Sequence, residues 1–210
     1  MPTHDPGYFS NIRPEIIEFV PQDVKKVLEV GCGYGFFGAM IKQRNGAEVW
    51  GVESNIDAAA EAVGRLDKVV EDNFEEGLDL PAGYFDCLVF NDVLEHLVEP
   101  EEALEYGKTL LSEGGVVVAS IPNVRYIKNV VHLVFGGDWK YTQDGILDRT
   151  HLRFFTHKSI IRLIGELGGE ILAVKGINPT RSKFFKLFNI ILFKRFDDMK
   201  YMQIVTVFRF

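Results

Sequence analysis

A group of glycines follows the first apolar run of the chain, and an acidic residue precedes it. Glu29 lies within the run, and Gly31, Gly33 and Gly35 come directly after it. Glycine accepts positive φ and lets a ligand approach the backbone closely. Glu53 follows Gly33 by 20 residues, after a second apolar run, where a carboxylate can accept both hydroxyl groups of a ribose. These residues predict a ribose-containing cofactor at the ends of two neighbouring strands.

The glycines by themselves leave two kinds of cofactor open. Residues 33–38 also fit the GxGxxG pattern of NAD-binding loops. Three observations disfavour NAD: Glu29 could meet a cationic amino group, no Tyr has a Lys four residues later, and we expect 210 residues to form one domain without a second catalytic domain. Saturable binding of NAD would contradict the preferred interpretation.

Two histidines stand where an active-site opening is expected. His96 follows the fourth apolar run, and His151 belongs to a dense group of polar and aromatic residues. Since imidazole exchanges protons near neutral pH, we predict that one of them is a general base. The alternatives are that they shape a helix start or pack an insertion. No metal site is expected, because Glu95 and His96 are adjacent and no His pair has i, i+4 spacing. Weaker candidates are His4, His132 and His157.

Charged and aromatic residues accompany these histidines and could contact an acceptor molecule. The arginines could bind a phosphate or carboxylate, or instead form ion pairs with Asp144 or Asp148. The aromatic side chains could stack on a sugar or another ring, or pack within the protein. The candidate acceptor-binding residues are Glu95, Tyr126, Trp139, Arg149 and Arg153, with Tyr141 beside them.

Alternating strands and helices must position these residues. Apolar runs predict buried parallel strands at 26–30, 48–52, 68–70, 85–90 and 116–121. Helices are predicted after the glycines through residue 43, and at 56–66, 100–111 and 156–167, and later strands at 170–177 and 201–210. Right-handed crossovers then give a doubly wound, mostly parallel α/β sheet in three α/β/α layers, with an antiparallel last strand.

Several of these motifs together resemble those of one enzyme family. Residues 29–35 read Glu-x-Gly-x-Gly-x-Gly and resemble motif I of class I S-adenosylmethionine-dependent methyltransferases. Residues 85–97 (FDCLVFNDVLEHL) resemble the family's fourth-strand motif, and residues 113–115 the turn before its fifth strand. With the strand order, the resemblance covers nearly the whole chain. It implies a Rossmann-like seven-stranded fold, the cofactor S-adenosyl-L-methionine and the product S-adenosyl-L-homocysteine.

The resemblance also implies which residues bind the cofactor. The methionine part would lie against Glu29 and the loop of Gly31, Cys32, Gly33 and Gly35. The ribose would lie at Glu53, with Ser54 beside it, and the adenine against Asp72, Asn73 and Phe74. Asn91 and Asp92 would form the floor of the site.

Two further elements resemble a subgroup of methyltransferases associated with saccharides and the cell envelope. They are Glu-His-Leu at 95–97 and Asp-Arg-Thr-His-Leu-Arg-Phe-Phe-Thr at 148–156. The resemblance implies O-methylation of a sugar or an envelope precursor. A quinone-type or other small metabolite and a non-catalytic cofactor-binding protein are the alternatives. A nucleic-acid or protein substrate is disfavoured, because no Asn/Asp-Pro-Pro-Tyr/Phe motif follows the fourth strand.

The charge of the chain is unevenly distributed. The net charge is −7, but residues 175–200 hold seven basic and two acidic residues, so this segment carries +5 and the remainder −12. An acidic remainder disfavours nucleic-acid binding. Two segments, about 123–153 and 180–197, do not fit the wound core and are expected on the acceptor side. Residues 182–196 (SKFFKLFNIILFKRF) could form a lid, a homodimer interface or a peripheral membrane contact.

Cysteine usage and the chain start bear on where the protein works. Cys32 and Cys87 lie in apolar surroundings rather than at disulfide spacings, and residues 1–10 lack the features of a signal peptide. We therefore expect a cytoplasmic protein.

Overall fold

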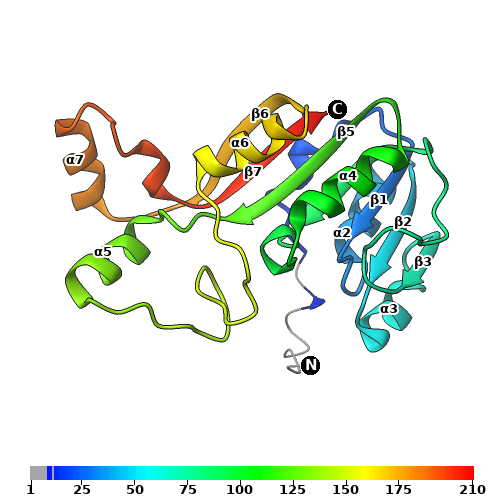
Figure 1. Ribbon diagram of the computed structural model, residues 1–210, viewed down its shortest axis with the longest axis horizontal. Helices are drawn as coiled ribbons and strands as arrows, with labels where there is room; N and C mark the ends of the chain where they lie inside the picture. Colours follow the sequence, from blue (N-terminus) through cyan, green and yellow to red (C-terminus); the bar gives the residue numbers. More distant parts are fainter. Residues whose placement is uncertain (1–8, 11) are drawn as a thin grey trace.

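The computed structural model describes residues 9–10 and 12–210. One mixed sheet runs through it in the order β3-β2-β1-β4-β5-β7-β6 (Figure 1). The pairs from β3 to β5 are parallel, and β7 is antiparallel to both β5 and β6. The seven-stranded, mostly parallel sheet with an antiparallel last strand is therefore confirmed. Its strands are β1 (Lys26–Val30), β2 (Glu48–Glu53), β3 (Lys68–Glu71), β4 (Phe85–Asn91), β5 (Leu111–Pro122), β6 (Glu170–Pro179) and β7 (Tyr201–Arg209).

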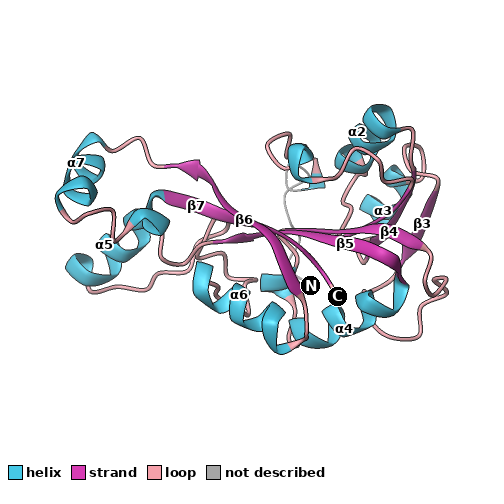
Figure 2. Ribbon diagram, turned by 90° about the horizontal axis from the view of Figure 1, so that it is seen from above, coloured by secondary structure: helices cyan, strands magenta, loops and turns pink. Residues whose placement is uncertain are grey.

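Helices cover both faces of the sheet and complete the three layers. In Figure 2, α2 and α3 lie on one side of the sheet, and α4 and α6 lie on the other. The helices are α2 (Phe36–Asn45), α3 (Ile56–Ala62), α4 (Pro100–Leu110), α5 (Ile127–Gly136), α6 (His157–Glu166) and α7 (Lys183–Ile191), with short 3₁₀ turns η1 (Ile17–Phe19), η2 (Leu94–His96) and η3 (Asp197–Lys200). No helix of the described chain is long and apolar enough to span a bilayer.

The alternation of side chains along the central strands divides the core into two clusters. Leu28 packs in a cluster with Leu104 of α4, whereas its neighbour Val27 packs in a second cluster with Ile41 of α2. Successive side chains of a strand point to opposite faces. Because both faces are covered by helices, the strands are apolar throughout, and this pattern made them readable in the sequence.

Two local predictions differ from the structure. The helix expected at 56–66 ends at Ala62, and the amides of Arg65 and Leu66 turn back to the Ala62 carbonyl oxygen. Gly64, a weak helix former, follows the C-cap residue Val63. The expected turn at 113–115 lies inside β5, where pairing jumps from Phe85↔Leu111 to Cys87↔Val116 around Gly114, whose φ is +75°.

The segment after β5 contains a helix that was not predicted from the sequence. α5 extends over Ile127–Gly136, and none of its residues is buried. In both views α5 lies at the same end of the molecule as α7, beyond the carboxyl end of β5 (Figures 1 and 2). Its apolar residues therefore do not serve the core of the sheet.

Candidate active site

The glycine loop joins β1 to α2 in a conformation that requires glycine. Gly31, Gly33 and Gly35 have φ values of +67°, +53° and +77°. A Cβ on Gly33 would lie 2.7 Å from the carbonyl oxygen of Phe9. Non-glycine residues adopt such φ values only at a cost, and the overlap adds to it. Glycine is therefore required at Gly33, both by its backbone conformation and by the close approach of the Phe9 carbonyl.

Glu53 is locked against this loop at the end of β2. Its Oε2 accepts the Gly33 amide at 2.8 Å, and its Oε1 accepts the Asn55 amide at 2.9 Å. Asn55 in turn caps α3 by accepting the Ala58 amide at 3.0 Å. Glu53 is almost fully buried, while Ser54 beside it is exposed. The carboxylate is thus held still next to the loop, and its contact with a ribose remains a prediction.

Glu29 lies beneath the loop as a buried acid with an unused oxygen. The residue is 2% exposed, and its Oε2 has no hydrogen-bond partner among the described residues. Burial, aided by the charge of Glu53, raises the pKa of Glu29 to about 8. A cationic amino group nearby would stabilise the ionised form and lower this pKa. The unpartnered buried acid next to the glycine loop fits S-adenosylmethionine.

The remaining cofactor candidates differ in their surroundings. Cys32 is buried, and burial raises the pKa of its thiol, so it acts as a small spacer rather than a nucleophile. Asp72 and Asn73 are exposed at the end of β3. The Phe74 ring packs in the core against Phe90, with ring centroids 5.6 Å apart. Their contact with adenine remains a prediction, and for Phe74 the structure already provides a packing role.

Asn91 and Asp92 end β4, but only Asn91 is left without partners. Both polar side-chain atoms of Asn91 are buried and unpaired among the described residues. Asp92 has a φ of +55° and forms an ion pair with Arg13. It also accepts a hydrogen bond from Gln203 Nε2 at 3.0 Å and a longer one from the Ser120 hydroxyl at 3.3 Å. The Asp92 carboxylate therefore ties together the N-terminal segment, β4 and β7.

Sequence reasoning missed Arg13 and Gln203. Asp92 and Gln203 are separated by 111 positions, and no motif joins either of them to Arg13. Gln203 also accepts a hydrogen bond from Arg13 Nη2 at 3.0 Å. Only the packing of the N-terminal segment over the sheet reveals the group.

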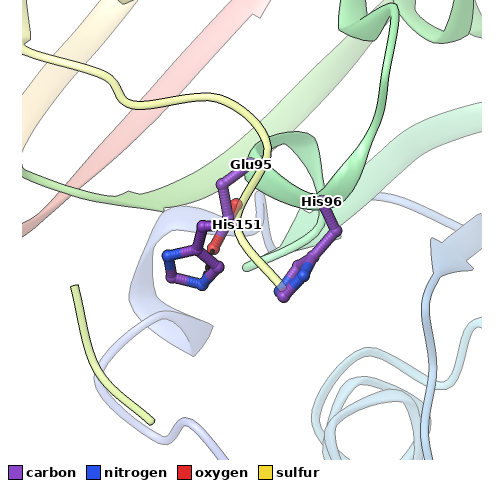
Figure 3. Close-up of side chains that lie close together, drawn as sticks. All are labelled: Glu95, His96 and His151. Carbon is purple, nitrogen blue, oxygen red and sulfur yellow. Dashed lines mark ion pairs between the residues drawn. The ribbon is translucent and has the colours of Figure 1, made fainter. Parts of the chain in front are cut away.

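Two histidines and one glutamate meet just after β4. Glu95 and His96 belong to η2, and His151 comes from the segment between α5 and α6 (Figure 3). The His96 and His151 rings lie edge to face with centroids 4.7 Å apart. His151 Nε2 is 4.0 Å from Glu95 Oε1. The carbonyl oxygen of Glu95 accepts the amides of Leu152 and Arg153 and so fixes the segment that carries His151.

The hydrogen bonds of the two rings determine which nitrogen can accept a proton. His151 Nδ1 lies 3.0 Å from the Ile146 carbonyl oxygen, and His96 Nδ1 lies 3.3 Å from the Thr150 carbonyl oxygen. A carbonyl only accepts, so in the neutral rings each Nδ1 carries the proton and each Nε2 keeps its lone pair. Burial lowers the pKa of His151, which keeps this ring neutral near pH 7.

Glu95 differs from an ordinary surface acid. It is 1% exposed, and neither side-chain oxygen has a hydrogen-bond partner among the described residues. Burial raises its pKa to about 8, so the carboxyl group is largely uncharged at neutral pH. We infer that Glu95 is an uncharged polar group of the site beside His151, and that it does not form a structural ion pair.

The same three residues could also hold a metal ion. One ligand atom from each of Glu95, His96 and His151 lies within 4.8 Å of the others. Two imidazoles and a carboxylate form a common ligand set for divalent transition metals. Sequence spacing did not reveal this grouping, because its third side chain comes from a distant segment rather than from helical spacing, and the expected absence of a metal stays a prediction.

The acceptor-side candidates do not all lie as expected. Arg153 pairs with Glu99, at 3.6 Å, and donates a hydrogen bond to the Val98 carbonyl oxygen, so it does not form the ion pair with Asp144 or Asp148 that the sequence left open as an alternative to anion binding. Asp148 instead accepts the Thr150 amide and hydroxyl, whereas the exposed Arg149 forms no ion pair with a described residue.

The aromatic candidates fall into two groups. Tyr126 is buried at the start of α5 and has a packing role. Trp139 and Tyr141 gather around Phe154, at centroid distances of 5.3 and 6.4 Å, and Phe154 lies 6.5 Å from His151. An aromatic group thus borders the histidines, and Phe154 is a member that the sequence interpretation did not single out. Of the weaker histidine candidates, His132 is exposed on α5, His157 begins α6, and His4 lies outside the described residues.

The strand order, the glycine loop and the acids after β1 and β2 together define a class. They are those of S-adenosylmethionine-dependent methyltransferases, and the protein is an enzyme of this class. Residues 7–174 match the methyltransferase domain family, and the chain belongs to this family.

Curated relatives and solved structures agree with this assignment. A ubiquinone biosynthesis O-methyltransferase of Burkholderia pseudomallei is 28% identical over 177 residues, covering 76% of this chain and 72% of the relative. One of Psychrobacter arcticus is 29% identical over 194 residues, covering 86% and 71%. The crystal structure of a SAM-dependent methyltransferase from Archaeoglobus fulgidus superposes with a TM-score of 0.66 at 18% identity, covering 93% of this chain and 91% of that one, which shows the shared fold.

Proposed function

We propose that this methyltransferase transfers the methyl group of S-adenosylmethionine to a hydroxyl oxygen of a small molecule, with His151 or His96 as general base. The observation that carries the proposal is the pair of imidazoles whose Nδ1 atoms are held by carbonyl oxygens. An oxygen nucleophile must lose its proton, and a neutral imidazole near pH 7 is suited to accept it. The nearly buried setting of His151 keeps that imidazole neutral.

The main contribution of the protein to this reaction would be to align the acceptor oxygen with the methyl group of the cofactor. The bound cofactor supplies an electrophilic methyl group on a sulfonium. The acceptor oxygen takes up this methyl group while its proton passes to a histidine Nε2, and the histidine later returns the proton to water. Glu29, Glu53 and the glycine loop would hold the cofactor, and the insertions at 123–153 and 180–197 would select and align the acceptor.

The aromatic group beside the histidines favours an aromatic acceptor. Phe154 lies next to His151 and is flanked by Trp139 and Tyr141, and offset ring stacking suits a flat phenolic ring. The relatives are named for ubiquinone biosynthesis and O-methylation, which agrees with a quinone-type metabolite. A saccharide, the acceptor first expected from the sequence, stays a second candidate because aromatic side chains also stack on sugars.

The direct test is methyl transfer from labelled S-adenosylmethionine to a panel of acceptors. Polyhydroxylated benzenes with an apolar side chain should be methylated on oxygen, and sugars and nucleotide sugars should react more slowly. Transfer to sugars alone would contradict the aromatic acceptor. Cofactor binding without transfer to any member of a broad panel would instead favour a non-catalytic binding protein.

The lowered pKa of His151 predicts the pH dependence of turnover. Only the neutral ring accepts a proton, so kcat should fall as the pH drops through a value below 6.5, the ordinary pKa of histidine. The rate should be level around neutral pH. A pH–rate profile at saturating substrate measures this, and an acid limb centred above pH 7 would contradict His151 as the base.

Metal removal distinguishes a site in which a histidine acts as general base from one in which the histidines bind a metal ion. We expect turnover to be unchanged after dialysis against EDTA, because the two Nε2 atoms can accept a proton without a metal and Glu95 is largely uncharged at neutral pH. Loss of activity that Mn²⁺ or Mg²⁺ restores would contradict this expectation. It would assign Glu95, His96 and His151 as ligands of a cation that acidifies the acceptor hydroxyl.

A further inference from the structure

Helix α7 exposes its apolar side to solvent instead of burying it. Phe184, Leu187, Phe188 and Ile191 have the i, i+3, i+4, i+7 spacing of one helix face, and all four are exposed, Phe184 to 80%. The opposite side supplies the buried residues Phe185 and Asn189. This is the reverse of an ordinary surface helix, whose apolar stripe faces the core.

The turn after α7 extends this exposed surface. Phe193 and Lys194 adopt positive φ values of 53° and 58°, and the Phe193 side chain is 95% exposed. The Asn189 side chain holds the turn in place, because its Oδ1 accepts the Phe196 amide at 3.0 Å and its Nδ2 donates to Asp197 at 3.2 Å. The outward position of Phe193 is therefore built into the turn.

Helix α5 contributes a second exposed apolar face at the same end of the molecule. Val131, Val134 and Phe135 are exposed, Phe135 to 84%. The segment before α5 is tied to η3, which follows α7, because Arg125 forms an ion pair with Asp198 at 2.8 Å. Both views place α5 and α7 together beyond the sheet (Figures 1 and 2). We call the exposed apolar residues of α5, α7 and the following turn the terminal patch.

The charge around α7 indicates what could cover the terminal patch. Residues 181–196 contain five basic residues and no acidic residue. All five, namely Arg181, Lys183, Lys186, Lys194 and Arg195, are exposed, and none takes part in an ion pair with a described residue. A second copy docking by the same patch would bring two such cationic segments together, which opposes a symmetric dimer.

We propose that the terminal patch docks on an anionic phospholipid surface, with the apolar side chains of α5, α7 and the following turn inserted among the headgroups and the cations paired with lipid phosphates. Phenylalanine and aliphatic side chains flanked by lysine and arginine are the composition of helices that lie in the membrane interface. The five cations that form no ion pair with a described residue would be attracted to negatively charged lipid headgroups.

Docking there would place the acceptor side of the enzyme at the lipid surface. The segment 123–153 carries α5 and also His151, so the α5 part of the patch and the candidate base belong to one insertion. An acceptor with an apolar tail could then reach the site from the membrane. This last step rests on the proposed function, whereas lipid binding is measured without methyl transfer, so the two can fail separately.

Vesicle flotation with the full chain tests the proposal. The protein should float with vesicles of phosphatidylcholine and phosphatidylglycerol, should float poorly with phosphatidylcholine alone, and should be released by high salt. Phe184→Ser with Phe193→Ser should weaken binding at least about tenfold, since two exposed aromatic rings lose their burial in lipid. Lys183→Gln with Lys186→Gln should weaken it roughly fivefold for each cation removed.

The matched control removes exposed apolar residues elsewhere. Val63→Ser with Leu172→Ser, at the end of α3 and on β6, should leave flotation unchanged, and binding of S-adenosylhomocysteine should show that every variant is folded. Absence of flotation with anionic vesicles, or flotation that the Phe variants do not reduce, would overturn the proposal. So would a lipid-free dimer, seen by sedimentation velocity, that the Phe variants dissociate while flotation is absent.

Discussion

Gly33→Arg is expected to abolish binding of S-adenosylhomocysteine, measured by isothermal titration calorimetry. Gly33 has a φ of +53°, and any Cβ there would lie 2.7 Å from the Phe9 carbonyl oxygen. The Gly33 amide is also the donor that holds Glu53 at 2.8 Å. The substitution therefore distorts the loop, moves the acid expected at the ribose, and displaces the Phe9 carbonyl that packs against the loop. The strained φ alone costs about 1–3 kcal/mol.

The matched control is a glycine with the same backbone but open surroundings. Gly83 has a φ of +62° and nothing within 4 Å of its Cβ position. Gly83→Ala should therefore lower the free energy of unfolding through backbone strain but leave ligand binding unchanged. If Gly33→Arg does not fold, Glu29→Gln serves instead. It keeps the shape of the side chain but removes the carboxyl group that would ionise beside the cationic amino group of the ligand, and should weaken binding by about tenfold or more. Unchanged affinity in both Gly33→Arg and Glu29→Gln would contradict the assigned cofactor site.

His151→Ala is expected to lower kcat by about 10²–10⁴-fold while the affinity for S-adenosylhomocysteine stays unchanged. The ring is the neutral, buried member of the pair, held by the Ile146 carbonyl oxygen at 3.0 Å. His96→Ala should also lower kcat, since the two rings lie 4.7 Å apart. If the rings act as one unit, the double variant should be little worse than the more damaging single variant.

The control for loss of an imidazole is His157→Ala, since His157 begins α6 and lies outside the cluster. Steady-state kinetics should show wild-type turnover for this variant. Calorimetry on each variant separates a chemical defect from a binding defect. Wild-type rates in both His96→Ala and His151→Ala would remove these residues from the mechanism, whatever the acceptor.

The wound core was predictable because its signals are local. Strands buried on both faces are continuous apolar runs, and the glycines needed by a loop with positive φ stand next to the strand that they follow. The Thr156 cap of α6 was readable in the same way, and the structure shows it as a capping box with Ser159. The antiparallel last strand was expected because two late strands separated by an excursion were interpreted as a hairpin-like edge of the sheet, and the pairing of β6 with β7 is antiparallel.

The candidate site was only half predictable. His96 and His151 could each be selected from their neighbours in sequence, but their meeting with Glu95, and so the possibility of a metal, depends on a segment that returns 55 residues later. The role of Asp92 was hidden for the same reason, because its partners Arg13 and Gln203 are brought to it by tertiary packing.

The amino-acid sequence alone determined the fold class, the cofactor loop and the uneven charge, since each depends on residue types and on spacings within one or two elements. Tertiary structure decided which distant side chains share one site and which apolar helices remain uncovered. The sequence of the cationic segment around α7 would be the same whether its apolar side chains were buried or exposed. Only its packing in the structure shows that Phe184 and Phe193 face solvent. Which side chains are buried, and which distant side chains contact one another, depends on how the elements pack in three dimensions and cannot be read from the order of residues along the chain.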